Sequence, residues 1–194
     1  MHSIIRSIAF STAIALFSPF ASAAVLDFDD IVGPDDIAAV PGNYGGLDWS
    51  ASGLNVITSE QWPFTPRSGQ GRVTTDFIDG GPIASTIHFL APTVFTGAWF
   101  SGFGDSSVRF DLYFQGQLVA TSAELLLAEA PAFLAAGWDS AIDTVVVSTG
   151  FQASYAMDDF TFESPAQVPE PGSLALILAG IGVVGTLRRR RSGH

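Results

Sequence analysis

Short runs in which apolar and polar residues alternate constrain this chain more than any other feature, because such runs form half-buried β-strands. The clearest run covers residues 107–114, where every second side chain is apolar. Gln115-Gly116 follows it, and a pair of this kind predicts a tight hairpin into a second strand over residues 117–121.

Similar patterns recur through the region between residues 25 and 162. Strands are predicted over residues 25–30, 54–58, 72–77, 83–90, 94–102, 142–148 and 155–162. Turn residues separate these strands at short intervals, a spacing that is typical of β-sandwiches. The sequence therefore predicts an all-β, jelly-roll-like β-sandwich.

Two stretches of this region need a further interpretation. Residues 123–136 have helical propensity, but Pro131 interrupts it. The segment is therefore either a helix or a strand followed by a bend and another strand.

In the last strand, Met157 lies opposite Phe160 by parity, although both are apolar. This mismatch predicts a β-bulge near the aspartates that separate them.

Residues 1–23 carry the features of a secretory signal peptide. A weakly basic start is followed by an apolar stretch over residues 8–20 and by the small-residue triplet Ala-Ser-Ala over residues 21–23. This order predicts export with cleavage after Ala23. An uncleaved N-terminal anchor is the alternative.

Three parts follow one another in the tail, residues 168–194. The first is Pro169-Glu170-Pro171, in which two fixed φ angles keep the backbone extended. The second is an uncharged apolar run over residues 173–187, which predicts a short transmembrane helix of about 22 Å, less than the ~30 Å hydrocarbon core of a bilayer. The third is a basic cluster that favours the cytoplasmic side of a membrane. Its members are Arg188, Arg189, Arg190 and Arg191.

This tail resembles the PEP-CTERM sorting signal of Gram-negative bacteria over residues 168–191. The resemblance implies that an exosortase, a membrane cysteine protease, recognises the Pro-Glu-Pro motif, the helix and the arginine cluster. It further implies passage through the inner membrane, transient anchoring there, and a final place at the cell surface or in the extracellular matrix of a biofilm. An ordinary C-terminal membrane anchor is the alternative. Residues 24–167 are then the exported domain.

The charge of this exported domain excludes one class of partner. The chain has 8 basic and 19 acidic residues, and five of its arginines and Glu170 lie outside residues 24–167. Three arginines and 18 acidic residues remain, a net charge of −15 with no lysine. Such a domain repels phosphate backbones, so we expect no nucleic-acid binding. It suits a soluble exported protein or one that collects divalent cations.

Cysteine is absent, which removes disulfides, thiolate catalysis and cysteine-ligated zinc. An exported domain without disulfides needs another way to fix its edges, and calcium is one candidate. Asp27 and Asp29 share one face of the first predicted strand, and Asp158 and Asp159 lie in the last. Because the terminal strands of a jelly roll commonly pair, these carboxylates are expected to meet and to bind structural calcium. The alternative is that they cap turns and face water.

The order of several motifs strengthens the sandwich prediction. The motifs are an Asp-x-Asp first strand, Tyr-Gly-Gly-x-x-Trp over residues 44–49, the hairpin after residue 107, Ile-Asp-Thr-Val-Val-Val from residue 142 and Met-Asp-Asp-Phe-Thr-Phe from residue 157. This order resembles jelly-roll domains of exported PEP-CTERM proteins and, more loosely, calcium-stabilised carbohydrate-binding modules.

Tryptophans supply the candidate ligand contacts. Trp62 lies in a Pro/Gly-rich loop over residues 59–71, where an exposed aromatic ring is able to stack on a sugar. Trp49 and Trp138 are further candidates, although Trp49 with Tyr44 is better interpreted as a cap on one end of the core.

We expect no catalysis from this domain. Its one histidine, His88, lies among apolar strand residues, and no Gly-x-Ser-x-Gly or glycine-rich phosphate loop occurs. Two functions remain. One is a non-catalytic surface or matrix protein associated with exopolysaccharide, and the other is a calcium-supported carbohydrate-binding module.

Overall fold

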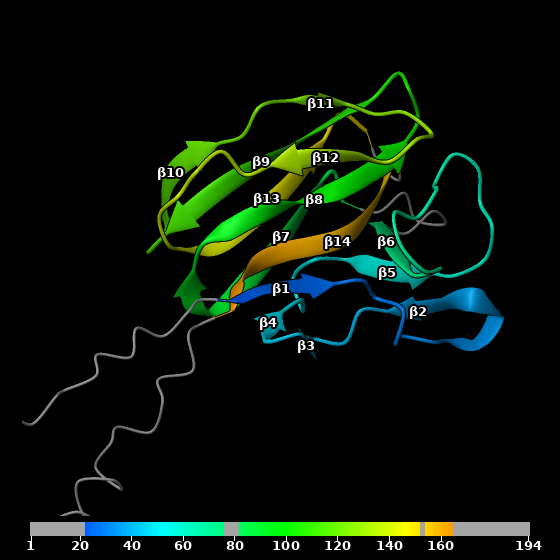
Figure 1. Ribbon diagram of the computed structural model, residues 1–194, viewed down its shortest axis with the longest axis horizontal. Coiled ribbons are helices and arrows are strands. Elements are labelled where there is room, and N and C mark those ends of the chain that lie inside the picture. The colour runs from blue at the N-terminus through cyan, green and yellow to red at the C-terminus, as the bar shows by residue number, and fades with distance from the viewer. Residues whose placement is uncertain (1–21, 76–81, 152–153, 165–194) are drawn as a thin grey trace, which may run out of the picture. The chain divides into compact units, whose positions relative to one another are not determined.

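The computed structural model describes residues 22–75, 82–151 and 154–164, which form two antiparallel seven-stranded sheets packed as a sandwich (Figure 1). The first sheet contains, in order, β12 (Ala132–Ala135), β8 (Phe95–Gly102), β14 (Tyr155–Ser164), β6 (Arg72–Thr75), β5 (Leu54–Ile57) and β2 (Ile37–Ala39), with β1 (Ser22–Leu26) paired to β14. The second contains β10 (Gln117–Thr121), β9 (Ser107–Phe114), β13 (Ile142–Thr149), β7 (Ala84–Thr93), β4 (Leu47–Asp48) and β3 (Asn43–Tyr44), with β11 (Leu125–Leu126) paired to β9. The predicted all-β sandwich is confirmed.

The core lies between the sheets and is built from the apolar positions of the alternating strands. Phe110 on β9 is fully buried, and its ring meets Phe95 of the opposite sheet at a centroid distance of 4.9 Å and Phe100 at 5.6 Å. These edge-on and tilted contacts are the preferred geometries of aromatic pairs. The alternation of β9 thus places Val108, Phe110 and Leu112 in the core.

The predicted hairpin at Gln115-Gly116 is present, and a second hairpin joins β3 to β4 through Gly45 and Gly46. Gln115 and Gly116 have φ values of 51° and 73°, and Gly45 and Gly46 have 59° and 80°. Left-handed conformations at both central residues match the twist of the flanking strands.

The chain between residues 123 and 136 is a strand, a bend and a strand, and not a helix. β11 pairs with β9 in the second sheet, and β12 pairs with β8 in the first. Pro131 lies between them and lacks the N–H that a helix interior needs. The segment therefore crosses from one sheet to the other.

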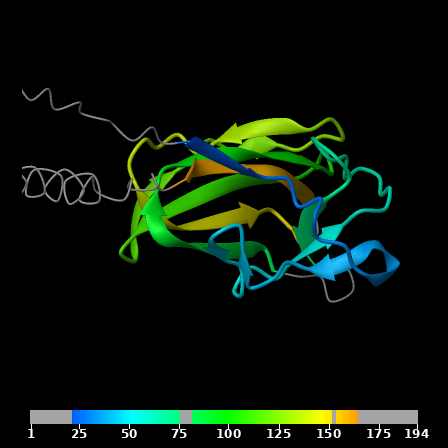
Figure 2. The ribbon, with the colours of Figure 1, turned by 60° about the horizontal axis from the view of Figure 1, so that its bottom comes forward.

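The first and last strands lie side by side, as predicted, with Leu26 opposite Phe160 and Ala23 opposite Glu163. Figures 1 and 2 show β1 along the edge of β14 from two directions. The predicted cleavage after Ala23 falls inside β1.

The first strand ends earlier than predicted, at Leu26, because Phe28 adopts a left-handed φ of 60°. Asp27 and Asp29 consequently lie beyond the strand and do not share one of its faces.

The predicted bulge in β14 is confirmed. The register of β14 against β8 shifts between Asp158 and Thr161, and Asp159 has a φ of 46°. Met157 and Phe160 are therefore both fully buried in the core. Asp158, between them in sequence, faces the outer side of the first sheet.

The predicted signal peptide and the predicted sorting tail lie outside the described residues. Among the residues that are described, no helix is long and apolar enough to cross a membrane.

Substitution of Phe110 tests this account of the core. We expect Phe110→Ala to lower the free energy of unfolding by about 3–5 kcal/mol, because it removes a ring that contacts two aromatic residues of the opposite sheet. Tyr113→Ala, on the other face of the same strand, is expected to lower it by about 1 kcal/mol or less. Denaturant unfolding measures both, and equal losses would contradict the assignment of the core face.

Candidate ligand-binding site on the loop between strands β5 and β6

A buried arginine organises the loop between β5 and β6, residues 58–71, which is cyan to green at one end of the sandwich in Figures 1 and 2. Arg72 is the first residue of β6 and is only 2% exposed. Its guanidinium donates hydrogen bonds to four backbone carbonyls, those of Ser59 (2.6 Å), Phe64 (2.8 Å), Gln70 (2.9 Å) and Ile57 (3.2 Å). One side chain thus ties the start, the middle and the end of the loop together.

Burial lowers the pKa of Arg72, and the nearby Asp158 carboxylate partly offsets this effect. A guanidinium stays charged in proteins even so, and a buried charge is tolerated only when its donors are satisfied. Hydrogen bonds to a charged donor are about twice as strong as neutral ones. The four carbonyls therefore compensate the burial of Arg72. The loop adopts the conformation in which all four of them point at the guanidinium.

Asp158 holds the same loop from the sheet side. Its Oδ2 accepts hydrogen bonds from the backbone N–H groups of Arg67 (2.7 Å) and Ser68 (2.9 Å), and Oδ1 accepts from Asp159 N (2.6 Å). The loop covers this carboxylate, which is only 3% exposed. Burial raises the pKa of Asp158 to about 6, because desolvation outweighs the three N–H groups that favour the ionised form.

Asp29 holds the end of the loop. Its Oδ1 accepts from the backbone N–H groups of Gln70 (2.8 Å) and Gly71 (2.6 Å). Asp29 and Asp158, which the sequence predicted to be calcium ligands, thus bind backbone N–H donors of one loop.

These contacts do not fit the predicted calcium site. Asp27 Oδ1 accepts from Asp29 N (3.2 Å), and Asp159 Oδ1 accepts from the Ser68 hydroxyl (2.7 Å). N–H donors take the place that a cation would need, and in the described part of the chain no three acidic or histidine side chains are grouped to hold a metal ion. Calcium at these four aspartates stays a prediction.

Trp62 lies in the middle of the same loop and is exposed to solvent. Its side chain is 74% exposed, yet two contacts fix it. The indole Nε1 donates to Glu129 Oε2 at 3.1 Å, and the ring meets Phe103 edge-on at 6.1 Å between centroids. Phe103 in turn lies 6.4 Å from the ring of Phe151, which is 41% exposed. Trp62 therefore presents a large aromatic surface in a fixed orientation.

A cavity of about 490 Å³ lies beside Trp62. Its walls combine the aromatic rings of Trp62 and Phe64 with groups able to form hydrogen bonds. These groups belong to Thr58, Glu60, Gln61, Thr65, Gln70, Arg72 and Glu129. An aromatic ring next to polar side chains is a combination suited to a sugar, which has apolar ring faces and hydroxyl groups at its edges.

The other two candidate tryptophans do not join this cavity. Trp49 is 2% exposed, donates its indole N–H to Tyr44 O at 2.9 Å and meets Phe28 and Phe160 edge-on, each at 5.6 Å. It is a core residue, which corrects its assignment as a ligand contact and confirms the interpretation as a core cap. Trp138 is half-buried and packs against the core, and its buried Nε1 has no hydrogen-bond partner among the described residues.

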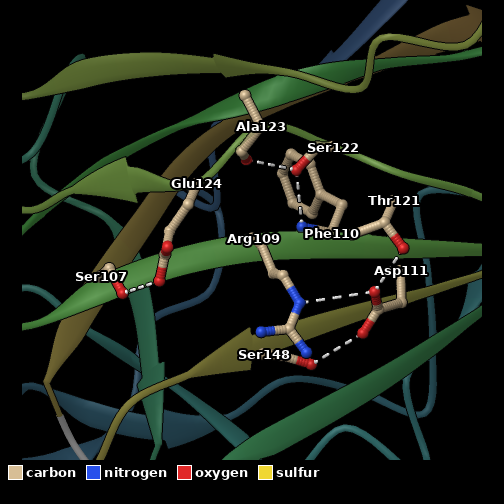
Figure 3. Close-up of polar contacts among 9 residues, drawn as sticks. All are labelled: Ser107, Arg109, Phe110, Asp111, Thr121, Ser122, Ala123, Glu124 and Ser148. Carbon is tan, nitrogen blue, oxygen red and sulfur yellow. Dashed lines mark hydrogen bonds and ion pairs between the residues drawn. The ribbon is translucent and has the colours of Figure 1, made fainter.

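Several polar side chains on the outer face of the second sheet pair with one another (Figure 3). Asp111 accepts hydrogen bonds from Thr121 Oγ1 (2.9 Å) and Ser148 Oγ (3.3 Å) and forms an ion pair with Arg109 Nε at 3.5 Å. His88 lies on β7, as predicted, with its Nδ1 2.9 Å from Thr144 Oγ1. These satisfied groups contrast with the exposed ring of Trp62.

Trypsin offers a direct test of the loop anchors, because the Arg67–Ser68 bond lies where Asp158 binds the backbone. We expect Asp158→Ala to raise the rate of cleavage after Arg67 at least about tenfold, since both N–H groups lose their acceptor. Cleavage after Arg109, within β9, is the internal control and should not change. Mass spectrometry of the fragments measures both rates, and equal acceleration at the two sites would indicate global unfolding instead.

The pKa of Asp158 predicts a dependence of stability on pH. The folded-state pKa is raised to about 6 from 3.8, so the folded protein binds this proton more tightly than the unfolded chain. The contribution to the free energy of unfolding is therefore largest below pH 4 and falls by about 2–3 kcal/mol as pH rises to 6. Asp158→Asn, which keeps an acceptor oxygen, should remove this slope in urea titrations at successive pH values. An unchanged slope would contradict the assignment.

Comparison with known proteins identifies the tail. Residues 167–191 match the family model of the PEP-CTERM protein-sorting motif, and no curated protein matches the chain. Two solved structures of variants of a family 29 carbohydrate-binding module, studied for ligand recognition, resemble the fold. They are 10% and 11% identical, with TM-scores of 0.43 and 0.44, and each alignment covers 78% of this chain and 99% of the other. Likeness at this level carries no argument about ligands. The tail match does identify the chain as a protein with a PEP-CTERM sorting motif, the signal of an exosortase substrate.

Proposed function

We propose that this protein is a non-catalytic surface protein of a Gram-negative bacterium, in which the β-sandwich binds an extracellular polysaccharide through Trp62 and its cavity. The sorting motif implies export, C-terminal membrane anchoring and exosortase processing. Those steps would place the sandwich outside the inner membrane, where an extracellular polysaccharide is accessible to it.

The observation that carries the proposal is the 74% exposure of a tryptophan that is fixed in place. Most large apolar side chains of this domain are in the core, whereas Trp62 is held outward by Glu129 and Phe103. The flat apolar faces of sugar rings stack on such aromatic surfaces. Because the ring and its loop are ordered before binding, little conformational entropy is lost when a sugar binds.

The cavity supports binding more than hydrolysis. Of its two carboxylates, Glu129 accepts the indole N–H of Trp62 and so orients the ring. Its amides and hydroxyls, from Gln61, Gln70 and Thr65, are suited to the hydroxyl groups of a sugar. A polysaccharide-binding surface needs this combination and no further chemistry.

Binding to a polysaccharide panel tests the proposal. The full chain, in a detergent without a sugar head group, is titrated with neutral, cationic and anionic polysaccharides. We expect saturable binding to at least one, and Trp62→Ala should weaken it at least about tenfold, or 1.4 kcal/mol. Phe133→Ala is the matched control, since Phe133 is 39% exposed but lies on β12 outside the cavity, and it should bind as the wild type does.

Two outcomes would contradict the proposal. One is a folded protein that binds no polysaccharide, and the other is binding that survives Trp62→Ala. A chelator added to the same titration tests calcium support. Because N–H groups occupy the predicted ligands, we expect binding to be unchanged, and a loss that calcium restores would favour a calcium site.

A further inference from the structure

We infer that the Trp62 cavity selects polysaccharides that carry protonated amino groups, such as polymers of glucosamine. This inference rests on the proposed polysaccharide site and names the chemical class that the site prefers. The preference depends on which charges face the cavity and on which of them are already paired.

Two carboxylates and one guanidinium line the cavity. Glu60 is exposed and makes no hydrogen bond or ion pair within the described residues, so its charge is available to a ligand. Glu129 accepts one hydrogen bond at Oε2, from Trp62, and a carboxylate has room for several more. An ammonium group that reaches this side of Trp62 would therefore find acceptors of the opposite charge.

None of the three arginines of the exported domain offers a free guanidinium to a ligand in the cavity, although the buried Arg72 keeps its charge at the cavity wall. Arg72 gives its guanidinium to four loop carbonyls, and Arg109 is paired with Asp111 on the other sheet. Arg67 is not among the residues that line the cavity, and its guanidinium carbon lies 4.3 Å from the centre of the Trp99 ring. A uronate or sulfate in the cavity would thus face two carboxylates and find no exposed guanidinium among the lining residues to pair with.

The electrostatic field of the whole domain also favours cationic over anionic ligands. A net charge of −15 over residues 24–167 attracts polycations and repels acidic polymers before contact. This long-range attraction acts on any polycation and does not by itself create a specific binding site. If the cavity is the site, the preference for the cationic oligomer depends on Trp62 as well as on Glu60.

Short oligomers separate the specific preference from this general attraction. The full chain in the same detergent is titrated with a glucosamine oligomer and with the N-acetylglucosamine oligomer of equal length, which is neutral. We expect the cationic oligomer to bind about tenfold more tightly, the effect of one ion pair close to the protein surface. The difference should shrink at high salt and at pH values at which the amine is neutral.

Isosteric variants then locate the effect. Glu60→Gln removes the charge and keeps the shape, so it should abolish most of the preference while the neutral oligomer binds as before. Glu129→Gln keeps an acceptor for the Trp62 indole and should also reduce the preference. Glu124→Gln, on the other sheet beside Ser107, makes the same change of charge and should leave the preference intact.

The outcomes separate this inference from the function on which it rests. Equal binding of both oligomers, lost in Trp62→Ala, would overturn the amine preference and keep the polysaccharide site. Tighter binding of a uronate oligomer would overturn the preference too, and so would a preference that Glu124→Gln weakens as much as Glu60→Gln does. No binding of any oligomer or polymer would overturn both.

Discussion

The buried guanidinium of Arg72 gives the β5–β6 loop one shape, and the exposed position of Trp62 depends on that shape. A loop of this length, rich in proline and glycine, buries only a small apolar cluster around Phe64. The four carbonyls that bind one charged side chain add to this cluster and hold the rest of the loop. Without the loop, Arg72 would be a buried charge with unsatisfied donors, and without Arg72 the loop carbonyls would face one another. Each therefore requires the other.

The sandwich supplies the second half of this support through the bulge in its closing strand. The bulge turns Met157 and Phe160 into the core and leaves Asp158 on the outer face, where it meets the loop backbone. Core packing and loop anchoring are thus coupled through consecutive residues of β14. The arrangement places a rigid aromatic residue at one end of a stable domain, a position from which an exported protein is able to bind a polymer. The sorting motif implies export, which the proposed binding of an extracellular polymer requires.

Local pattern predicted most of the fold, because strands and hairpins depend on neighbours in sequence. The strand over residues 107–114, the Gln115-Gly116 turn and the bulge near Asp158 all follow from alternation or parity. The first strand was predicted too long, since Leu26 and Phe28 continue the alternation although the backbone turns at Phe28. The site was less predictable: Trp62 stood out by its proline-rich context, but Glu129 and Phe103 reach it from distant parts of the chain. The carboxylates of Asp29 and Asp158 fit a cation equally well until their N–H partners are known.

The most direct test of the account is the indole N–H resonance of Trp62 in a ¹⁵N-labelled protein titrated with a glucosamine oligomer. The chain has four tryptophans, and a Trp62→Phe variant assigns the signal. We predict that the Trp62 indole signal shifts progressively to saturation while that of the buried Trp49 stays in place. A Trp62 signal that does not move at saturating oligomer, or a response confined to the other tryptophans, would contradict the claim that this fixed, exposed ring is the binding surface.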